Sequence, residues 1–404
     1  MRALSLLGLL TASPALAGTE TLSTDIGKNG LAAVEAQLAA VSAPAPDERF
    51  ALAGVRFLRV IEQALQTQQR EGIVDPSGFI PFARLMAGTP PRTEPIRAEA
   101  MAELLTQAAA GLEAARAPLA GLAPDADFAV TVDLKDIWFD LNADGARAPG
   151  ESALDILGPQ LMGWRWSERD PNTPAPVIRF DSADAAWLSA YTHLLAGVGD
   201  LLLAYDPTPA YQRLIDSQMA FQTLNMQPAP GPDDMAADWT LSLQTTIDSI
   251  APLVWMLRHD PDRARMTSAH GHLQAMIADN RRFWTMVAAE TDNDREWLPN
   301  DSQTAALGLT VPQGTGARWL AVLDDLDALL SGQKLLPYWR TGDGAGVNIA
   351  RFFDDPAPID LADWIQGAGA VPYLEKGTLV TGESWGAFDN LLLGDSFLFA
   401  VYLN

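Results

Sequence analysis

Hydrophobic residues recur mostly at helical spacing along this chain. Apolar side chains fall three and four residues apart in several long segments, so each segment can turn one apolar face to a core. The helices predicted in this way cover residues 26–40, 48–69, 97–115, 152–166, 186–205, 234–259, 261–290 and 316–330. Asp47 is placed to cap the second helix, and Asp260-Pro261 should divide an antiparallel hairpin of two helices.

Two stretches depart from this spacing. Residues 128–134 alternate between apolar and polar side chains, which is the period of a half-buried strand. Residues 335–404 are dense in glycine, proline and aromatic side chains, which favours a small mixed α/β cap packed on the helices. The sequence therefore predicts a mainly α protein of antiparallel helix hairpins, with a strand-loop-helix segment and a C-terminal cap.

The same patterns suggest how the chain is organised. We expect a signal peptide over residues 1–17, an N-terminal helical region over 18–125, a central helical region over 126–334 and the cap over 335–404. Residues 18–404 are compatible with one domain, since no long low-complexity linker divides them.

The first 17 residues have the features of a secretory signal. Arg2 precedes an apolar run, and small residues at Ala15 and Ala17 form a cleavage pattern before Gly18. The apolar run is too short to span a bilayer, so no transmembrane segment is expected. The sequence predicts export to the periplasm of a Gram-negative bacterium, or secretion, with cleavage after Ala17.

Composition narrows the class of partner. The chain has no cysteine, so it can form no disulfide, and its formal net charge is −24. Such a surface repels phosphate backbones, which argues against nucleic-acid binding. A protein or a small molecule is the expected kind of partner.

Residues 140–151 carry the most specific chemistry in the chain. They read D-L-N-A-D-G-A-R-A-P-G-E, with side-chain oxygens at positions 1, 3, 5 and 12 and glycine at position 6. A twelve-residue loop with oxygens at these positions, and a backbone carbonyl at position 7, suits Ca²⁺. Glycine at position 6 permits the sharp turn that such a loop needs.

Over these twelve residues the chain resembles an EF-hand or dockerin-type calcium loop. The resemblance implies that Ca²⁺ is held by Asp140, Asn142, Asp144, the carbonyl of Ala146, and Glu151. The loop departs from the family pattern at position 8, where Arg147 replaces an apolar residue. A strand precedes it, so it is expected to be single and unpaired. The alternative interpretation is a solvated turn of Asp, Asn and Gly residues.

Other candidate groups have structural explanations beside the functional ones. His193 and Asp200 share a face of small residues on one predicted helix, while His270 interrupts the apolar seam of another, as does Asn280. Such polar groups are usually buried and hydrogen-bonded, although they can also line a cleft.

Two further motifs are weaker. Asp292, Asp294 and Glu296 suggest a second cation site, but Gln303 at the twelfth position cannot supply a bidentate carboxylate. Gly382-Glu383-Ser384-Trp385-Gly386 matches G-x-S-x-G, yet no histidine follows it, so a glycine turn is favoured over a hydrolase nucleophile.

The expected function is that of an exported calcium-binding protein, with Ca²⁺ as a structural staple. A binding or structural role is favoured over catalysis, and no catalytic residue is assigned. The alternative is a periplasmic enzyme with a cleft between the helices that carry His193, Asp200 and His270. The roles of His259 and His272, the substrate or partner, and the oligomeric state stay open.

Overall fold

The computed structural model describes residues 21–72, 97–123, 126–162, 164–170, 172–224, 247–248, 250–309, 311–392 and 399–400. The expected signal peptide and most of the helix expected over 234–259 lie outside these residues. The expected hairpin is therefore described only in part: the chain leaves the helical conformation after Met256 and the next helix begins at Arg263, so the break expected at Asp260-Pro261 is present.

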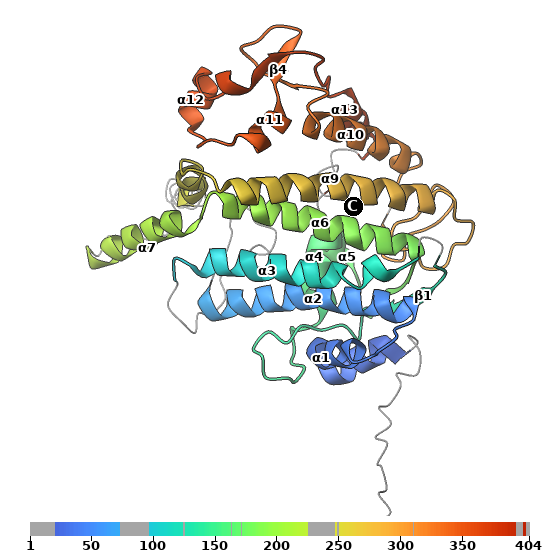
Figure 1. Ribbon diagram of the computed structural model, residues 1–404. Helices are drawn as coiled ribbons and strands as arrows, with labels where there is room; N and C mark the ends of the chain where they lie inside the picture. Colours follow the sequence, from blue (N-terminus) through green and yellow to red (C-terminus); the bar gives the residue numbers. More distant parts are fainter. Residues whose placement is uncertain are drawn as a thin grey trace, which may run out of the picture.

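The body of the protein is a stack of helices. It contains α1 (Leu22–Ala39), α2 (Pro46–Glu71), α3 (Ala100–Arg116), α6 (Ser182–Ala204) and α9 (Arg263–Val287). Figure 1 shows them lying one above another, with each packed on the next in that order. The prediction of a mainly α protein is confirmed.

Amphipathic patterning explains why these helices form, and local chemistry adjusts their ends. Asp47 lies in the first turn of α2, so the prediction that it caps this helix was wrong. Ala45 stands before the helix, and its backbone N–H donates to Glu48 Oε2 at 2.8 Å. Within α1, the helical geometry breaks at Gly30, where φ is +77°.

A two-stranded sheet crosses one side of the stack. β1 (Ala129–Asp133) pairs antiparallel with β2 (Val177–Asp181), and Val130 lies opposite Phe180. The strand predicted from the alternating pattern is thus present. Between the two strands the chain forms the loop 140–151, α4 (Ala153–Met162) and α5 (Trp164–Glu168), where the sequence suggested one continuous helix.

The C-terminal part lies beyond α9 (Figure 1). α10 (Thr315–Leu330) and α11 (Ile349–Asp354) pack on α9, and α13 (Glu383–Leu391) packs on α10. A three-stranded antiparallel sheet joins β3 (Leu336–Pro337), β4 (Ala345–Val347) and β5 (Leu374–Lys376) in that order. The remaining short helices are η2 (Leu119–Gly121), α12 (Leu361–Gln366) and η3 (Val371–Tyr373).

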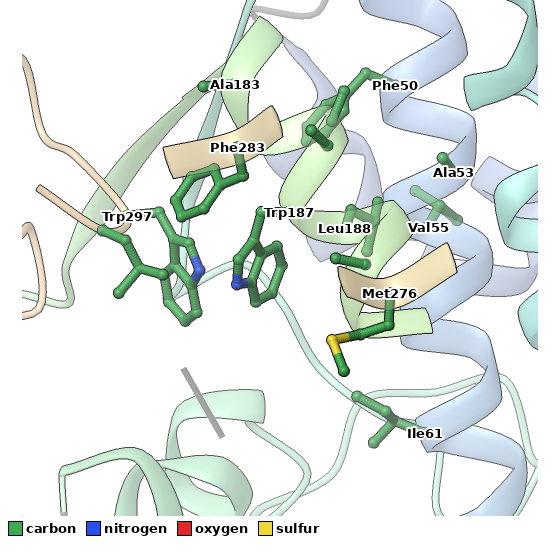
Figure 2. Close-up of a cluster of buried hydrophobic side chains, with 14 of the residues drawn as sticks. Phe50, Ala53, Val55, Ile61, Ala183, Trp187, Leu188, Met276, Phe283 and Trp297 are labelled. Carbon is green, nitrogen blue, oxygen red and sulfur yellow. The ribbon is translucent and has the colours of Figure 1, made fainter. Parts of the chain in front are cut away.

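The main core lies between α2, α6 and α9. Figure 2 shows apolar side chains from these helices meeting around Trp187 and Trp297. α7 (Thr208–Thr223) extends away from the stack in Figure 1. Among the described residues, none of the helices combines the length and the apolar character that crossing a membrane requires.

Candidate functional site

The loop 140–151 is closed at its base by backbone hydrogen bonds. Phe139 N–H donates to the Glu151 carbonyl at 2.8 Å, and Ala153 N–H donates to the Ile137 carbonyl at 3.0 Å. Ile137 and Phe139 are buried, so the base of the loop is part of the core. The two ends of the loop are therefore held together by buried, hydrogen-bonded residues.

Side chains of the predicted calcium ligands hydrogen-bond to the backbone of the first half of the loop. The Asp140 carboxylate accepts the N–H of Asp144 at 3.1 Å and that of Gly145 at 2.8 Å. Asn142 Oδ1 accepts the same Asp144 N–H, and Asp144 Oδ1 accepts the N–H of Ala146. The bonds of Asn142 and Asp144 are Asx turns, in which a short polar side chain binds the backbone two residues ahead of it. Gly145 has φ of +75°, the left-handed conformation expected at position 6.

Glu151 folds back over the loop from the twelfth position. Its side chain is buried, Oε1 accepts the N–H of Leu141 at 3.0 Å, and Oε2 accepts the N–H of Ala148 at 2.6 Å. The carboxylate thus joins the two ends of the loop to each other. Since each carboxylate oxygen has two lone pairs, these bonds leave accepting capacity unused.

Helix α2 supports the first residue of the loop. Gln66 Nε2 donates to the Asp140 carbonyl at 2.6 Å. Glu62, one turn earlier, is 2% exposed and pairs with Arg59 at 2.9 Å. Burial raises the pKa of Glu62 to about 7, against the lowering effect of Arg59, and the negative charge of Asp140 adds to the rise. Neither support was predictable from sequence, because α2 lies far from the loop along the chain.

The donor set of the loop suits a hard cation, because all of its ligands would be oxygens. Asp140, Asp144 and Glu151 bring carboxylates, Asn142 an amide oxygen, and Ala146 a backbone carbonyl. Throughout the described residues, including this loop, no three His, Cys, Asp or Glu side chains are gathered closely enough to hold a metal ion. The left-handed Gly145 lies at position 6, as the calcium-loop pattern expects. The carboxylates of Asp140 and Glu151, however, accept hydrogen bonds from backbone N–H groups and do not converge on one point.

A second polar group lies between α6 and α9. His193 Nδ1 is 2.8 Å from His272 Nδ1, and His272 Nε2 is 3.9 Å from Asp200 Oδ2. Asp200 also accepts a hydrogen bond from Arg265 at 2.7 Å. Burial and the neighbouring positive charge of Arg116 lower the pKa of both histidines, that of His193 to about 4. The pair is therefore neutral at neutral pH.

His270, expected to join His193 and Asp200, lies elsewhere. It is hydrogen-bonded through Nε2 to the Leu330 carbonyl at 2.8 Å, and its ring stacks on Phe353 with centroids 4.7 Å apart. Residues two apart on a helix point about 200° apart, so His270 faces the C-terminal part whereas His272 faces α6. The grouping expected from sequence is corrected, because His272 takes the place of His270.

Asn280, the other polar residue of that seam, is also hydrogen-bonded. Its side chain is 1% exposed, and Oδ1 accepts the indole N–H of Trp319 at 2.7 Å. His270 and Asn280 are thus both hydrogen-bonded to groups of α10, and a purely structural role for them stays a prediction.

The acidic residues near β2 are engaged with neighbouring backbone and side-chain groups. Glu296 Oε1 accepts the N–H of Asp294, while Asp294 pairs with Arg295 at 2.8 Å. Gln303 Nε2 donates to Glu290 at 3.1 Å. Burial is the largest cause that raises the pKa of Glu290, to about 7. Burial also raises the pKa of Glu296. These carboxyls lie in a desolvated cluster beside Arg179, which is 3.6 Å from Asp292.

The G-x-S-x-G motif opens a helix. Gly382 has φ of +73° and precedes α13, and Ser384 Oγ donates to Asp325, which also pairs with Lys334. The favoured interpretation as a glycine turn agrees with this geometry.

An apolar cavity of about 240 Å³ lies between α1, α2, the β1–β2 sheet, α4 and α6. Its surface is almost wholly apolar over the described lining residues. The sequence offered one sign of it: Gly54 interrupts the apolar stripe of α2 between Phe50 and Leu58, and all three line the cavity.

Comparisons with known proteins give no match for this chain, whether with protein-family models, curated proteins or solved structures.

Proposed function

We propose that this chain is an exported, periplasmic calcium-binding protein in which Ca²⁺ acts as a structural staple. In this proposal residues 128–166 form a calcium-dependent strand-loop-helix segment, and residues 335–404 form a mixed α/β cap on the helices. The cleavable segment 1–17 and the formal net charge of −24 support a cation-rich compartment outside the cytoplasm.

One observation carries the calcium proposal. The loop has the expected oxygen-bearing residues at positions 1, 3, 5 and 12, and its backbone is wound in the same register. Gly145 is left-handed at position 6, and Glu151 returns from position 12 to the N–H of position 2. A solvated turn would not require a buried carboxylate at its far end.

The role of the ion follows from charge. Asp140, Asp144 and Glu151 place three carboxylates on twelve residues, beside the further carboxyl group of Glu62. A divalent cation supplies the positive charge that offsets their mutual repulsion. Asp140, Asn142, Asp144, the Ala146 carbonyl and Glu151 would hold it, and the loop would then fix where α4 begins.

Calorimetric titration of Ca²⁺ into the mature chain, residues 18–404, tests this proposal. A single loop without the apolar residue at position 8 should bind with Kd on the order of 10⁻⁴ to 10⁻³ M, as extracellular modules do. Glu151→Gln should weaken binding at least about tenfold, because it removes the bidentate carboxylate. Asp343→Asn, at an exposed position outside the loop, makes the same change of charge and should leave Kd unchanged.

Two results would contradict the proposal. One is the absence of a Ca²⁺ isotherm in the wild-type chain. The other is an equal loss of Ca²⁺ affinity in Glu151→Gln and Asp343→Asn, which would show that Ca²⁺ responds to the overall surface charge and not to the loop.

The alternative function, a periplasmic enzyme with a cleft at His193, Asp200 and His270, has less support. His270 is bound to the Leu330 carbonyl, apart from the other two residues. The group that does assemble can equally be structural, because its members hydrogen-bond across the interface of α6 and α9, His193 to His272 and Asp200 to Arg265.

A further inference from the structure

A second pocket, with a volume of about 400 Å³, opens where α7 leaves the stack (Figure 1). It is lined by the first turns of α7 and by the segment 255–260 that precedes α9, and most of the lining surface is polar. The N–H of Asp262 donates to the Ala204 carbonyl at 2.8 Å, which joins the two walls where α6 ends. Pockets of this size take small molecules.

Arg213 brings a positive charge to this pocket with no carboxylate beside it. Its guanidinium lies over the ring of Trp255, with Cζ 4.3 Å from the ring centroid. The side chain is exposed, so a ligand can reach its N–H groups. Among the residues that the structure describes, Arg213 has no hydrogen-bond acceptor and no ion-pair partner. A guanidinium that lies over an indole keeps the N–H groups at its edge available to an anion.

Arg258 brings a second guanidinium to the same pocket. Its Nε is 3.0 Å from Asp360 Oδ2, and the N–H of Ile359 donates to the Leu257 carbonyl at 2.6 Å, so the C-terminal part fixes this wall. The pair with Asp360 leaves donors unused, since a guanidinium has five N–H groups. The chain has 27 Lys and Arg residues against 51 Asp and Glu residues. Two guanidiniums in one pocket of so acidic a chain mark a place that attracts an anion.

The other two polar side chains of the pocket suit hydroxyl groups. Within the described part of the chain, neither the His259 ring nor the Asp260 carboxylate has a hydrogen-bond or ion-pair partner. A carboxylate accepts hydrogen bonds from hydroxyl groups, and an imidazole both donates and accepts them. Asp260 also repels negative charge, so the pocket favours an anion with one charge over an anion with two.

We propose that this pocket binds a small hydroxylated monocarboxylate, that is, a hydroxy acid or a sugar acid. Arg213 and Arg258 hold the carboxylate through charge-assisted hydrogen bonds, while His259 and Asp260 bind hydroxyl groups of the same molecule. The mostly polar lining offers little surface to a hydrocarbon ligand. The proposal does not rest on the calcium loop, because none of the lining residues belongs to it.

Three probes with the same six-carbon polyol chain test this ligand class: gluconate has one carboxylate, glucarate has two, and sorbitol has none. Saturation-transfer NMR measures the binding of each to residues 18–404, in chelator so that Ca²⁺ does not pair with the probes. Gluconate should bind with Kd on the order of 1 mM, as expected for a ligand of about this size. Glucarate should bind several-fold more weakly, and sorbitol at least about tenfold more weakly.

Two exposed arginines provide a matched pair of variants. Arg213→Gln should weaken gluconate binding at least about tenfold, because it removes a charged donor group. Arg213→Lys keeps the charge but not the planar group over Trp255, so it should retain only part of the affinity. Arg282→Gln, near the other end of α9, makes the same change of net charge and should leave Kd unchanged. Equal losses in Arg213→Gln and Arg282→Gln would overturn the proposal.

Asp260→Asn tests the preference for a single charge. The ratio of the glucarate Kd to the gluconate Kd should fall several-fold in this variant, because the repulsion of the second carboxylate is removed. An unchanged ratio would overturn the role of Asp260. A wild-type chain that does not bind gluconate, or that binds it no better than sorbitol, would overturn the site itself.

Discussion

The backbone N–H of Ala153 donates to the carbonyl of Ile137 at 3.0 Å, and both residues also line the apolar cavity. One hydrogen bond thus closes the base of the loop 140–151 and joins two parts of the cavity wall. Whatever orders the loop should also order this wall, because α4 begins at Ala153.

Glu62 predicts that stability falls as pH rises. Its pKa is about 7 in the folded chain, against about 4.5 when unfolded. Between these pH values the folded state keeps a proton that the unfolded state loses, so the unfolding free energy decreases as pH rises. The contribution of this one group is at most about 3 kcal/mol.

Urea unfolding at pH 5 and pH 8 checks this prediction. Glu62→Gln should flatten the pH dependence relative to wild type, because the amide does not ionise. Glu99→Gln, at an exposed position, should keep the wild-type slope. A parallel slope in Glu62→Gln would show that this carboxyl ionises normally in the folded state.

The histidine pair predicts a pH effect of the opposite sign. The pKa of His193 is about 4 in the folded chain, below its usual 6.5, and that of His272 is lowered as well. As pH falls below 6.5 the unfolded state takes up protons first, so this contribution to stability is lost between about pH 6.5 and 4.

Proton NMR titration of the histidine rings measures these values directly. The chain has four histidines, so each signal is assignable by substitution with Gln. His193 should titrate well below pH 6, and its pKa should move upward in His272→Gln, where the second ring no longer opposes its charge. A midpoint near 6.5 in the wild-type chain would mean that the pair is open to water.

Replacing His270 and replacing Asn280, two polar residues of α9, should lower the unfolding free energy by different amounts. His270→Leu should leave the fold intact and lower the unfolding free energy by about 1 kcal/mol, since it removes one partner of the partly buried Leu330 carbonyl. Asn280→Leu should cost more, about 1–3 kcal/mol, because the buried Trp319 N–H would lose its acceptor. Urea unfolding of both variants gives the order, and a greater loss in His270→Leu would contradict this account.

Local patterns were sufficient for much of this structure. The alternation in residues 128–134 identified β1, and helical spacing identified α2, α3, α6, α9 and α10 to within a few residues. The calcium register of the loop 140–151 stays a prediction, although the left-handed Gly145 falls where one short segment placed it. Helix ends were less accurate: Glu48 rather than Asp47 provides the side chain that binds the backbone before α2.

Relationships between distant segments were not accessible from sequence. The choice of His272 over His270 as the neighbour of His193 depends on how α9 is rotated against α6, which one helix alone does not define. Gly197 lets α9 approach closely at that point, with Leu273 Cδ2 3.3 Å from where a Cβ would lie. The cavity depends on even more elements, so its only local sign was the glycine in the stripe of α2.

Thermal melting of residues 18–404 tests the central claim, that Ca²⁺ is a structural staple of the loop 140–151. Wild type, Glu151→Gln and Asp343→Asn are each compared with themselves in millimolar Ca²⁺ and in chelator, so any intrinsic effect of a substitution cancels. At about 100 times Kd, Ca²⁺ bound only to the native state adds about 2.7 kcal/mol. We therefore expect Ca²⁺ to raise Tm by several degrees in wild type and Asp343→Asn, and by little or nothing in Glu151→Gln. A wild-type Tm that is the same in Ca²⁺ and in chelator would contradict the account and reduce the loop to a turn.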